Sequence, residues 1–172
     1  MKKLVLLVSL LLAGLVAGAQ ELHCTFTSTK TIKAVHKDIK GSGTVVYRAP
    51  DYMSMIYDTP EGEYLIIDGN TLKNCVAGKA VTLDTSKNAF MRNLRNTLIN
   101  CVNGDYETAA KENDASLIVE EKNGIKTVTL LARKKAVKGY AGIIVDYNTK
   151  GLPVRMVLDE FSGIVTEFRF NY

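Results

Sequence analysis

The side chains that could perform catalysis are few, and their spacing does not form an active site. The two histidines, His23 and His36, are not spaced with a nucleophile or with a cluster of metal ligands. The adjacent carboxylates Glu120-Glu121 and Asp159-Glu160 lie in runs patterned as strands, where neighbouring side chains face opposite ways. The sequence contains no P-loop, nucleophile elbow or H-E-x-x-H motif. We therefore expect a binding protein, not an enzyme, with no metal and no cofactor.

The three cysteines, Cys24, Cys75 and Cys101, are the other reactive side chains. Their spacing matches neither a metal knuckle nor a thioredoxin motif, and any of the three possible pairs could form one disulfide. Buried free thiols that act as small hydrophobic side chains are an equally good interpretation.

The N-terminus has the pattern of a secretory signal peptide. Lys2 and Lys3 precede an apolar run from Leu4 to Val16, and the small residues Ala17-Gly18-Ala19 follow it. A spanning helix needs ~20 apolar residues, so a cleaved leader fits better than a membrane anchor. We expect residues 1–19 to be removed and residues 20–172 to form one exported, soluble domain.

The length and charge of the chain limit its function further. With 172 residues, 47% of them hydrophobic, it can bury a core without metals or disulfides. Removal of Lys2 and Lys3 leaves 20 basic and 18 acidic side chains, a net charge of +2, which does not indicate nucleic-acid binding. The one basic run, Arg133-Lys134-Lys135 with Lys138, is either a solvated loop or a docking patch for an acidic surface.

The stretch from Gly41 to Gly69 holds three short strand-like runs separated by an Ala-Pro-Asp corner and a Pro-Glu-Gly turn. Alternate side chains on a strand share a face, and here one face is apolar and aromatic while Arg48, Ser54 and Asp58 fall on the other. The members of the apolar face are Val45, Tyr47, Met53, Met55 and Tyr57. That face is either ordinary core or the wall of an apolar cavity.

The hydrophobic period changes near Ser86 to that of a helix, with Ser86 as the expected N-cap and Gly104 as the stop. The apolar face of this helix consists of Phe90, Met91, Leu94, Leu98, Cys101 and Val102, and the expected wet face of Arg92, Asn93, Arg95 and Asn96. A shorter helical turn over 105–112 is expected after it.

The rest of the chain is patterned as strands joined by short turns, which predicts an antiparallel meander. Strands are expected over 25–35, within 41–69, and over 71–76, 79–84, 116–121, 125–132, 141–147, 152–159 and 164–171. About eleven strands of this kind form a sheet that twists and curls. Only the helix over 86–102 is available to cover its concave face. The fold class is therefore mainly β with a helical lid.

Several motifs together resemble the LolA-like outer-membrane lipoprotein carriers. The resemblance spans nearly the whole exported chain and is strongest from Gly43 to Leu72. The motifs are Gly-x-Val at Gly43, Arg48 close before Pro50, the Met-x-Met-x-Tyr strand, Pro60, the apolar run into Asp68-Gly69, and Gly104-Asp105-Tyr106.

This resemblance implies an incomplete, strongly curved antiparallel β-barrel of eleven strands with an amphipathic helix as its lid. It further implies a monomeric periplasmic carrier whose cavity takes lipoprotein acyl chains. An inner-membrane ABC-type complex would release the lipoprotein to the carrier, which would pass it to an acceptor, not identified here, at the outer membrane.

Carried over by position, the resemblance assigns two sets of ligand-binding residues. The acyl-chain cavity would be lined by Val45, Tyr47, Met53, Met55, Tyr57 and Ile66, with Met156 as a further flexible side chain. The lid would present Phe90, Met91, Leu94 and Leu98. A disulfide between Cys75 and Cys101 would tether one end of this lid.

The chain departs from the family at the lid latch. In the family an arginine directly before the proline holds the lid, whereas here Ala49 has that place and Arg48 precedes it. Because one step along a strand reverses the side chain, we expect Arg48 to point outward.

Two other functions stay open at this stage. A half-barrel of the same fold could bind envelope lipids or act as a sensor without transporting anything. A small exported enzyme with a dispersed site is the third possibility.

Overall fold

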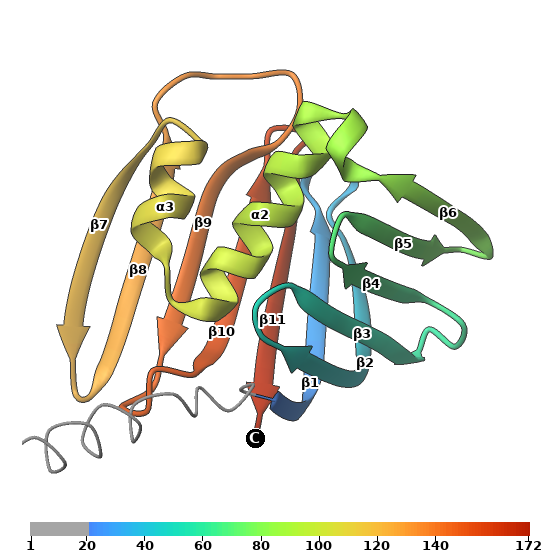
Figure 1. The fold of residues 1–172 in the computed structure, drawn as a ribbon, viewed down its shortest axis with the longest axis horizontal. Helices are drawn as coiled ribbons and strands as arrows, with labels where there is room; N and C mark the ends of the chain where they lie inside the picture. The colour runs from blue at the N-terminus through green and yellow to red at the C-terminus, as the bar shows by residue number, and fades with distance from the viewer. Residues whose placement is uncertain (1–20) are drawn as a thin grey trace, which may run out of the picture.

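The computed structural model describes residues 21–172, so the expected leader lies outside the described residues. These residues form eleven strands, two α-helices and two short 3₁₀ helices (Figure 1). The strands are β1 (Glu21–Ile32), β2 (Lys37–Arg48), β3 (Tyr52–Thr59), β4 (Tyr64–Asp68), β5 (Thr71–Val76), β6 (Lys79–Asp84), β7 (Ala115–Lys122), β8 (Ile125–Ala132), β9 (Tyr140–Tyr147), β10 (Pro153–Glu160) and β11 (Ile164–Asn171). The helices are η1 (Lys33–Val35), η2 (Thr85–Lys87), α2 (Ala89–Asn103) and α3 (Tyr106–Glu112).

All eleven strands belong to one antiparallel sheet in the order β6-β5-β4-β3-β2-β1-β11-β10-β9-β8-β7. The chain therefore forms two meanders, β1 to β6 and β7 to β11, with η2, α2 and α3 between them. The two meanders join where β1 pairs with β11, for example Thr25 opposite Asn171. This long-range pairing brings the first and last strands together at the centre of the sheet.

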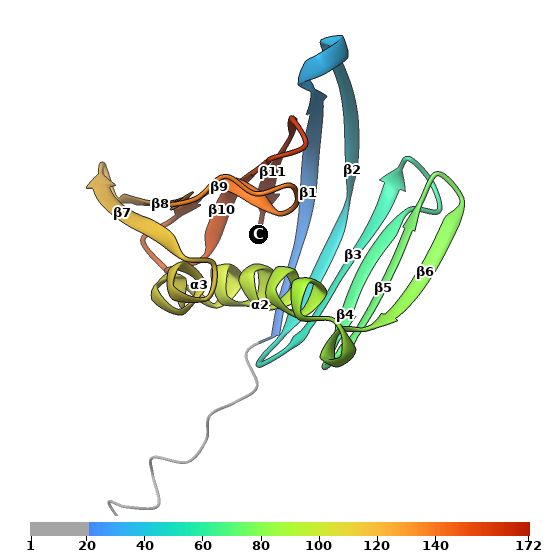
Figure 2. The ribbon, with the colours of Figure 1, turned by 90° about the horizontal axis from the view of Figure 1, so that it is seen from above.

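The sheet curls around α2 and stays open between its edge strands β6 and β7. Seen from above, α2 lies within the curve of the sheet, and α3 continues it toward β7 (Figure 2). This is the expected incomplete barrel with a helical lid, so the sequence-based prediction of the fold is confirmed.

Local sequence explains the tight turns between neighbouring strands. Asn123 and Gly124 connect β7 to β8 with φ angles of 53° and 76°, the left-handed values that a two-residue hairpin turn requires. Ala77 and Gly78 do the same between β5 and β6, with φ angles of 50° and 74°. These turns keep neighbouring strands antiparallel and adjacent.

The lid helix begins later than its apolar period predicts. Asn88, not Ser86, is its N-cap: the Asn88 side chain accepts a hydrogen bond from the Met91 amide at 3.1 Å. Ser86 lies in η2, where its amide and hydroxyl both donate to Asp84 Oδ1, so its hydroxyl is used as a donor. The predicted stop is confirmed, because Gly104 ends α2 with a φ of 74°.

Gly43 allows two aromatic rings to pack against β2. It lies opposite Phe26 on one neighbouring strand and opposite Tyr57 on the other, and these rings make an edge-to-face contact with centroids 4.9 Å apart. A Cβ atom at Gly43 would lie 2.0 Å from the backbone oxygen of Ile56. No side chain fits there without moving backbone.

We expect Gly43→Ala to lower the free energy of unfolding by about 1 to 3 kcal/mol, because the new methyl group overpacks a site bounded by backbone. Gly142→Ala is the matched control, since a Cβ on that strand glycine would meet only Leu131 Cδ2 at 3.4 Å and Leu130 O at 3.7 Å. Urea unfolding of both variants measures the difference. Equal stability of the two would contradict this account of Gly43.

Candidate functional site

A cavity of about 120 Å³ lies between α2 and the concave face of the sheet. It has sixteen lining residues, which come from β1 to β4, β9 to β11, α2 and the C-terminal Tyr172. Most of its wall is apolar side chain, and no charged residue lines it. Such a site favours an apolar ligand, and the titratable groups in its lining are the thiol of Cys24 and the hydroxyls of Tyr47, Tyr140 and Tyr172.

Five of the seven residues predicted for the cavity line it. They are Val45, Tyr47, Met53, Met55 and Met156. All five are nearly inaccessible, with exposed fractions of 3% to 7%. The alternation of apolar and polar side chains along β2 and β3 therefore identified one wall of the cavity. That these residues bind a ligand stays a prediction.

Tyr57 and Ile66 do not line the cavity. Tyr57 shares the face of Met55 but packs against Phe26 in the core beside the cavity. Ile66 lies opposite Ser54 on β3, so its side chain points to the convex side of the sheet. Its neighbour Leu65 lies opposite Met55 and lines the cavity instead. The assignment of Ile66 was wrong by one residue, which reverses the face.

The wall opposite β2 and β3 was missed by the sequence analysis, except for Met156. It includes Leu22 and Cys24 from β1, Leu158 from β10, and Phe168 and Phe170 from β11. Their signal was present, because Phe168, Phe170 and Tyr172 alternate along one face of the last strand. Only the pairing of β1 with β11 shows that this face meets the others.

The four predicted lid residues differ in the cavity that they line. Leu98, with Val102 one turn later, covers the main cavity. Phe90 and Leu94 line a second cavity of about 270 Å³ between α2 and the loop that joins β8 to β9. Met91 is half-buried and lines neither of these two cavities. Tyr140 belongs to both cavities, so they adjoin across its ring.

Arg95 connects the middle of the lid to the sheet. Its Nη2 lies 3.3 Å from Asp51 Oδ2, in the corner between β2 and β3, and its side chain is only 14% exposed. In the described part of the chain this is the only ion pair between α2 and a strand or a turn between strands. The expectation that Arg95 lies on a wet face was wrong, because that side of α2 faces the corner.

Two of the other predicted wet residues of α2, Asn93 and Asn96, contact α3, whereas Arg92 is exposed. Asn93 Nδ2 donates to the Glu112 carbonyl oxygen at 3.1 Å, and Asn96 Nδ2 donates to the Glu112 carboxylate at 3.3 Å. Asn113 donates to the buried hydroxyl of Thr97 at 2.7 Å. The polar side of the lid is therefore a contact between the two helices.

Hydrogen bonds to the sheet anchor both ends of the lid. Before α2, the Thr85 amide and hydroxyl each donate to the Asn70 carbonyl oxygen at 2.8 Å. At the other end, the Tyr147 hydroxyl donates to the Cys101 carbonyl oxygen at 2.6 Å, and the Tyr47 hydroxyl is hydrogen-bonded to Asn103 Oδ1. Burial raises the pKa of both tyrosines, so they remain neutral donors.

The three cysteines are free thiols. Cys75 lies beside Asn74, which is opposite the cavity residue Leu65, so Cys75 faces the convex side, away from Cys101 on the lid. A tether between these two is therefore absent. Burial raises the pKa of Cys24 to about 11 and that of Cys101 to about 12, which keeps both thiols protonated and unreactive.

The family comparison matches residues 17–172 to the model described as "Outer membrane lipoprotein carrier protein LolA". The chain belongs to the LolA family. A search of curated protein sequences finds no significant match.

Solved structures with a similar arrangement include three of low sequence identity. A LolA superfamily protein from Nitrosomonas europaea is 12% identical, with 90% of this chain and 86% of that chain covered and a TM-score of 0.38. A putative outer membrane lipoprotein-sorting protein domain from Vibrio parahaemolyticus is 9% identical, with coverages of 91% and 85% and a TM-score of 0.40. Lipoprotein LppX from Mycobacterium tuberculosis is 9% identical, with coverages of 90% and 86% and a TM-score of 0.37.

This LolA-family chain holds its lid with charges arranged differently from the pattern expected for the family. Arg48 is exposed, and its guanidinium stacks 4.1 Å from the centroid of the Tyr52 ring, so it points outward as expected. The arginine that contacts the corner comes instead from the lid, as Arg95, and the corner supplies the carboxylate of Asp51. The arginine of this contact therefore lies on the lid and not in the corner.

Two further findings concern only residues 21–172 of this LolA-family chain. They contain no group of three or more histidine, cysteine, aspartate or glutamate side chains that could hold a metal ion. None of their helices is long and apolar enough to cross a membrane.

We expect Arg95→Met to increase the alkylation rate of Cys101 about five-fold, because loss of about 1 kcal/mol of lid contact raises the open population by that factor. Cys101 is 1% exposed on the lid, so a thiol reagent reaches it only when α2 moves. Mass spectrometry of the modified peptide measures the rate.

Arg92→Met is the control for this measurement, because the exposed Arg92 donates only to Ser86 O within its own segment. Asp51→Asn should act in the same direction as Arg95→Met. An equal increase in Arg92→Met, or none in Arg95→Met, would show that the Arg95 contact does not hold the lid.

Proposed function

We propose that this chain binds the acyl chains of lipoproteins in the cavity under α2 and carries lipoproteins from the inner to the outer membrane. The observation that carries the proposal is an apolar cavity covered by an amphipathic helix, in a chain of the LolA family. The chain acts in this proposal as a chaperone and not as an enzyme.

The closed cavity is too small for a whole acyl chain, which makes lid movement part of the mechanism. A cavity of about 120 Å³ is close to the engineered ~150 Å³ cavity that holds a single benzene. Ligand pockets for larger molecules span roughly 300 to 1,000 Å³. An acyl chain must therefore displace Leu98 and Val102 from the position they occupy in the closed state.

Burial of the ligand supplies enough free energy to displace the lid. A long acyl chain gains ~0.8 kcal/mol per buried CH₂ group, on the order of 10 kcal/mol in total. An apolar side chain that leaves the core costs about 1.5 to 3 kcal/mol, so displacement of Leu98, Ile99 and Val102 costs at most about as much as the ligand gains. The lipid would thus shift the population from closed to open without any dedicated switch.

Methionines give the cavity the adaptability that a carrier needs. Met53, Met55 and Met156 line it on two walls, and their unbranched side chains repack around ligands of different shape. A cavity that adapts holds a chain by burial alone and makes few directional contacts. Such a ligand can leave when an acceptor offers an equally apolar site.

The proposed place of action is based on the sequence pattern and the family. We take residues 1–19 as a cleaved leader and residues 20–172 as a monomeric domain that works in the periplasm. The donor would be an inner-membrane ABC-type release complex, and the acceptor would lie at the outer membrane.

We expect Met55→Asp to lower the affinity for a fluorescent fatty-acid probe more than ten-fold, because a carboxylate in the cavity wall loses its hydration when the probe binds. Ile56→Asp is the matched control: Ile56 is the next residue on β3, is 41% exposed and faces the convex side. Fluorescence titration of both folded variants compares the two. If wild type binds no probe, or if both variants bind equally, the cavity is not the lipid site.

Depletion of the protein in its own organism separates a carrier from a half-barrel that binds lipid without moving it. We expect lipoproteins to accumulate at the inner membrane, because their acyl chains would lack a route through water. Membrane fractionation followed by lipoprotein detection measures the distribution. Unaltered sorting would support a lipid-binding or sensor module instead.

A further inference from the structure

The loop between β8 and β9, residues 133–139, combines a protruding apolar side chain with four cations. Val137 is 91% exposed, the largest exposed fraction among the large hydrophobic residues described. Arg133, Lys134, Lys135 and Lys138 surround it in the sequence. Neither the cavity nor the lid latch uses these side chains.

The cations of this loop are only partly neutralised. Arg133 Nη1 and Lys134 Nζ each lie 3.9 Å from a carboxylate oxygen of Asp114, so two cations share one anion. In the described residues, Lys135 and Lys138 take part in no ion pair. The loop therefore carries an excess of positive charge around Val137.

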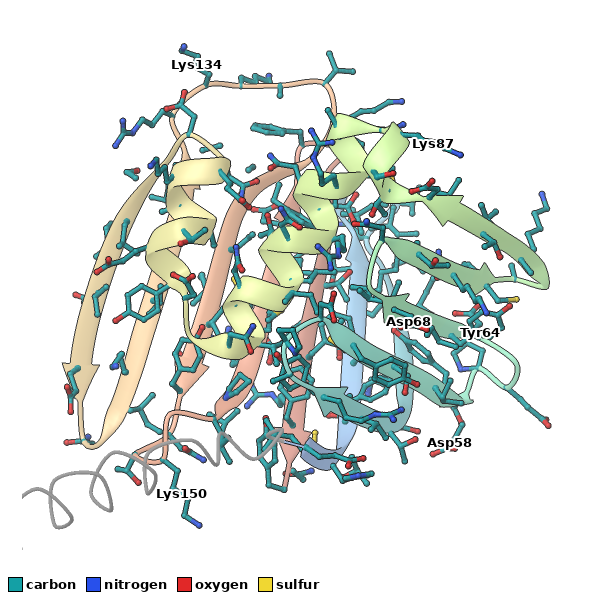
Figure 3. All side chains as sticks on the ribbon, viewed as in Figure 1. Asp58, Tyr64, Asp68, Lys87, Lys134 and Lys150 are labelled. Atoms are coloured by element: carbon teal, nitrogen blue, oxygen red, sulfur yellow. The ribbon has the colours of Figure 1, made fainter. Side chains whose placement is uncertain are left out.

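The start of the lid lies at the same end of the molecule. The loop arches next to the first turn of α2, and Lys134 and Lys87 both lie at this end (Figures 1 and 3). Phe90, 40% exposed, lines the second cavity together with Val137 and Lys138. We call Lys87, Phe90 and residues 133–138 the basic rim.

We propose that the basic rim docks on an anionic phospholipid bilayer, with Val137 inserted among the headgroups and the cations facing lipid phosphates. Lysines and arginines close to an anionic membrane surface are attracted to it, and an apolar side chain adds burial at the boundary with the acyl chains. This inference rests on the proposed function, because it identifies the surface on which the lid would open.

A bilayer suits the shape of this rim better than an acidic protein does. Val137 projects from a loop, so a folded partner would need a complementary pocket to bury it, whereas a fluid headgroup layer adapts to any projection. The cations also lie in two segments, the loop and η2, although Lys87 in η2 is paired with Asp84 at 3.3 Å, so the excess positive charge lies on the loop. An acidic protein partner becomes one outcome of the test.

Docking by the basic rim would shorten the path of an acyl chain through water. The second cavity lies between the loop and the first half of α2, and Tyr140 separates it from the main cavity. A membrane held at this rim would face the edge of the lid that Phe90 and Leu94 form. An acyl chain that the donor complex releases at this membrane would then pass Tyr140 into the main cavity.

Co-sedimentation of the mature chain with phosphatidylcholine vesicles, with and without phosphatidylglycerol, tests the proposal. We expect binding only to the anionic vesicles, and binding that weakens as salt is added. Lys135→Gln with Lys138→Gln should lower the affinity about five-fold per cation removed. Val137→Ser should lower it further, since it removes the inserted side chain.

The matched control is Lys122→Gln with Lys150→Gln, which removes the same charge from turns at the other end of the sheet, where Lys150 is visible (Figure 3). This control should keep the wild-type affinity for vesicles. Absence of vesicle binding, an equal loss in the control, or an unaltered affinity in Val137→Ser would overturn the proposal. Capture by immobilised polyglutamate without vesicle binding would identify an acidic protein partner and also overturn it.

Titration of the same variants with the fatty-acid probe, in buffer without vesicles, separates the two proposals. The loop variants should bind the probe like wild type, because their substitutions lie outside the main cavity. If wild type binds the probe but not the vesicles, only the proposal that the basic rim docks on a membrane is contradicted. If wild type does not bind the probe, the proposed function itself is contradicted.

Discussion

The structure depends on one constraint: an eleven-stranded sheet that curls without closing has a concave apolar face larger than its single lid can cover. The lid helix has fifteen residues and lies over the middle of the sheet, where β1 pairs with β11. Toward the edge, all six residues of β6 are exposed, including Val81 at 49% and Leu83 at 36%. The cavity therefore lies at the middle of the sheet, where the lid covers the concave face but side chains do not fill the space beneath it.

The way the lid is held follows from this geometry. Apolar contacts hold the lid at Ile99 and Cys101, which are 5% and 1% exposed within the core, whereas a cavity lies beneath Leu98 and Val102. Polar bonds also anchor its ends, at Thr85 and near Cys101, while Arg95 holds its middle to Asp51. An ion pair of which one side chain is 47% exposed adds little to these contacts. Burial of a ligand must therefore compensate mainly for the apolar contacts that α2 loses when it moves.

Sequence periodicity predicted the elements well but predicted the site only on one side. Alternation placed Val45, Tyr47, Met53 and Met55 on one face because β2 and β3 are regular there. The error at Ile66 arose because the turn between β3 and β4 resets which residues face inward, and its length sets that parity. The wall from β1 and β11 needs a pairing between residues more than 130 positions apart, which no local pattern contains.

The position of Arg95 shows a second limit of predictions from hydrophobic periodicity. A helical period separates apolar from polar sides, yet it does not show what lies next to the polar side. Here α3 contacts Asn93 and Asn96, and the corner after β2 contacts Arg95. Both polar contacts therefore depend on where the tertiary fold places α3 and this corner relative to α2. Arg48 is stacked outward on Tyr52, so it is not directed at the lid. The ion pair between the lid and the corner has its cation, Arg95, on the helix and its anion, Asp51, in the corner.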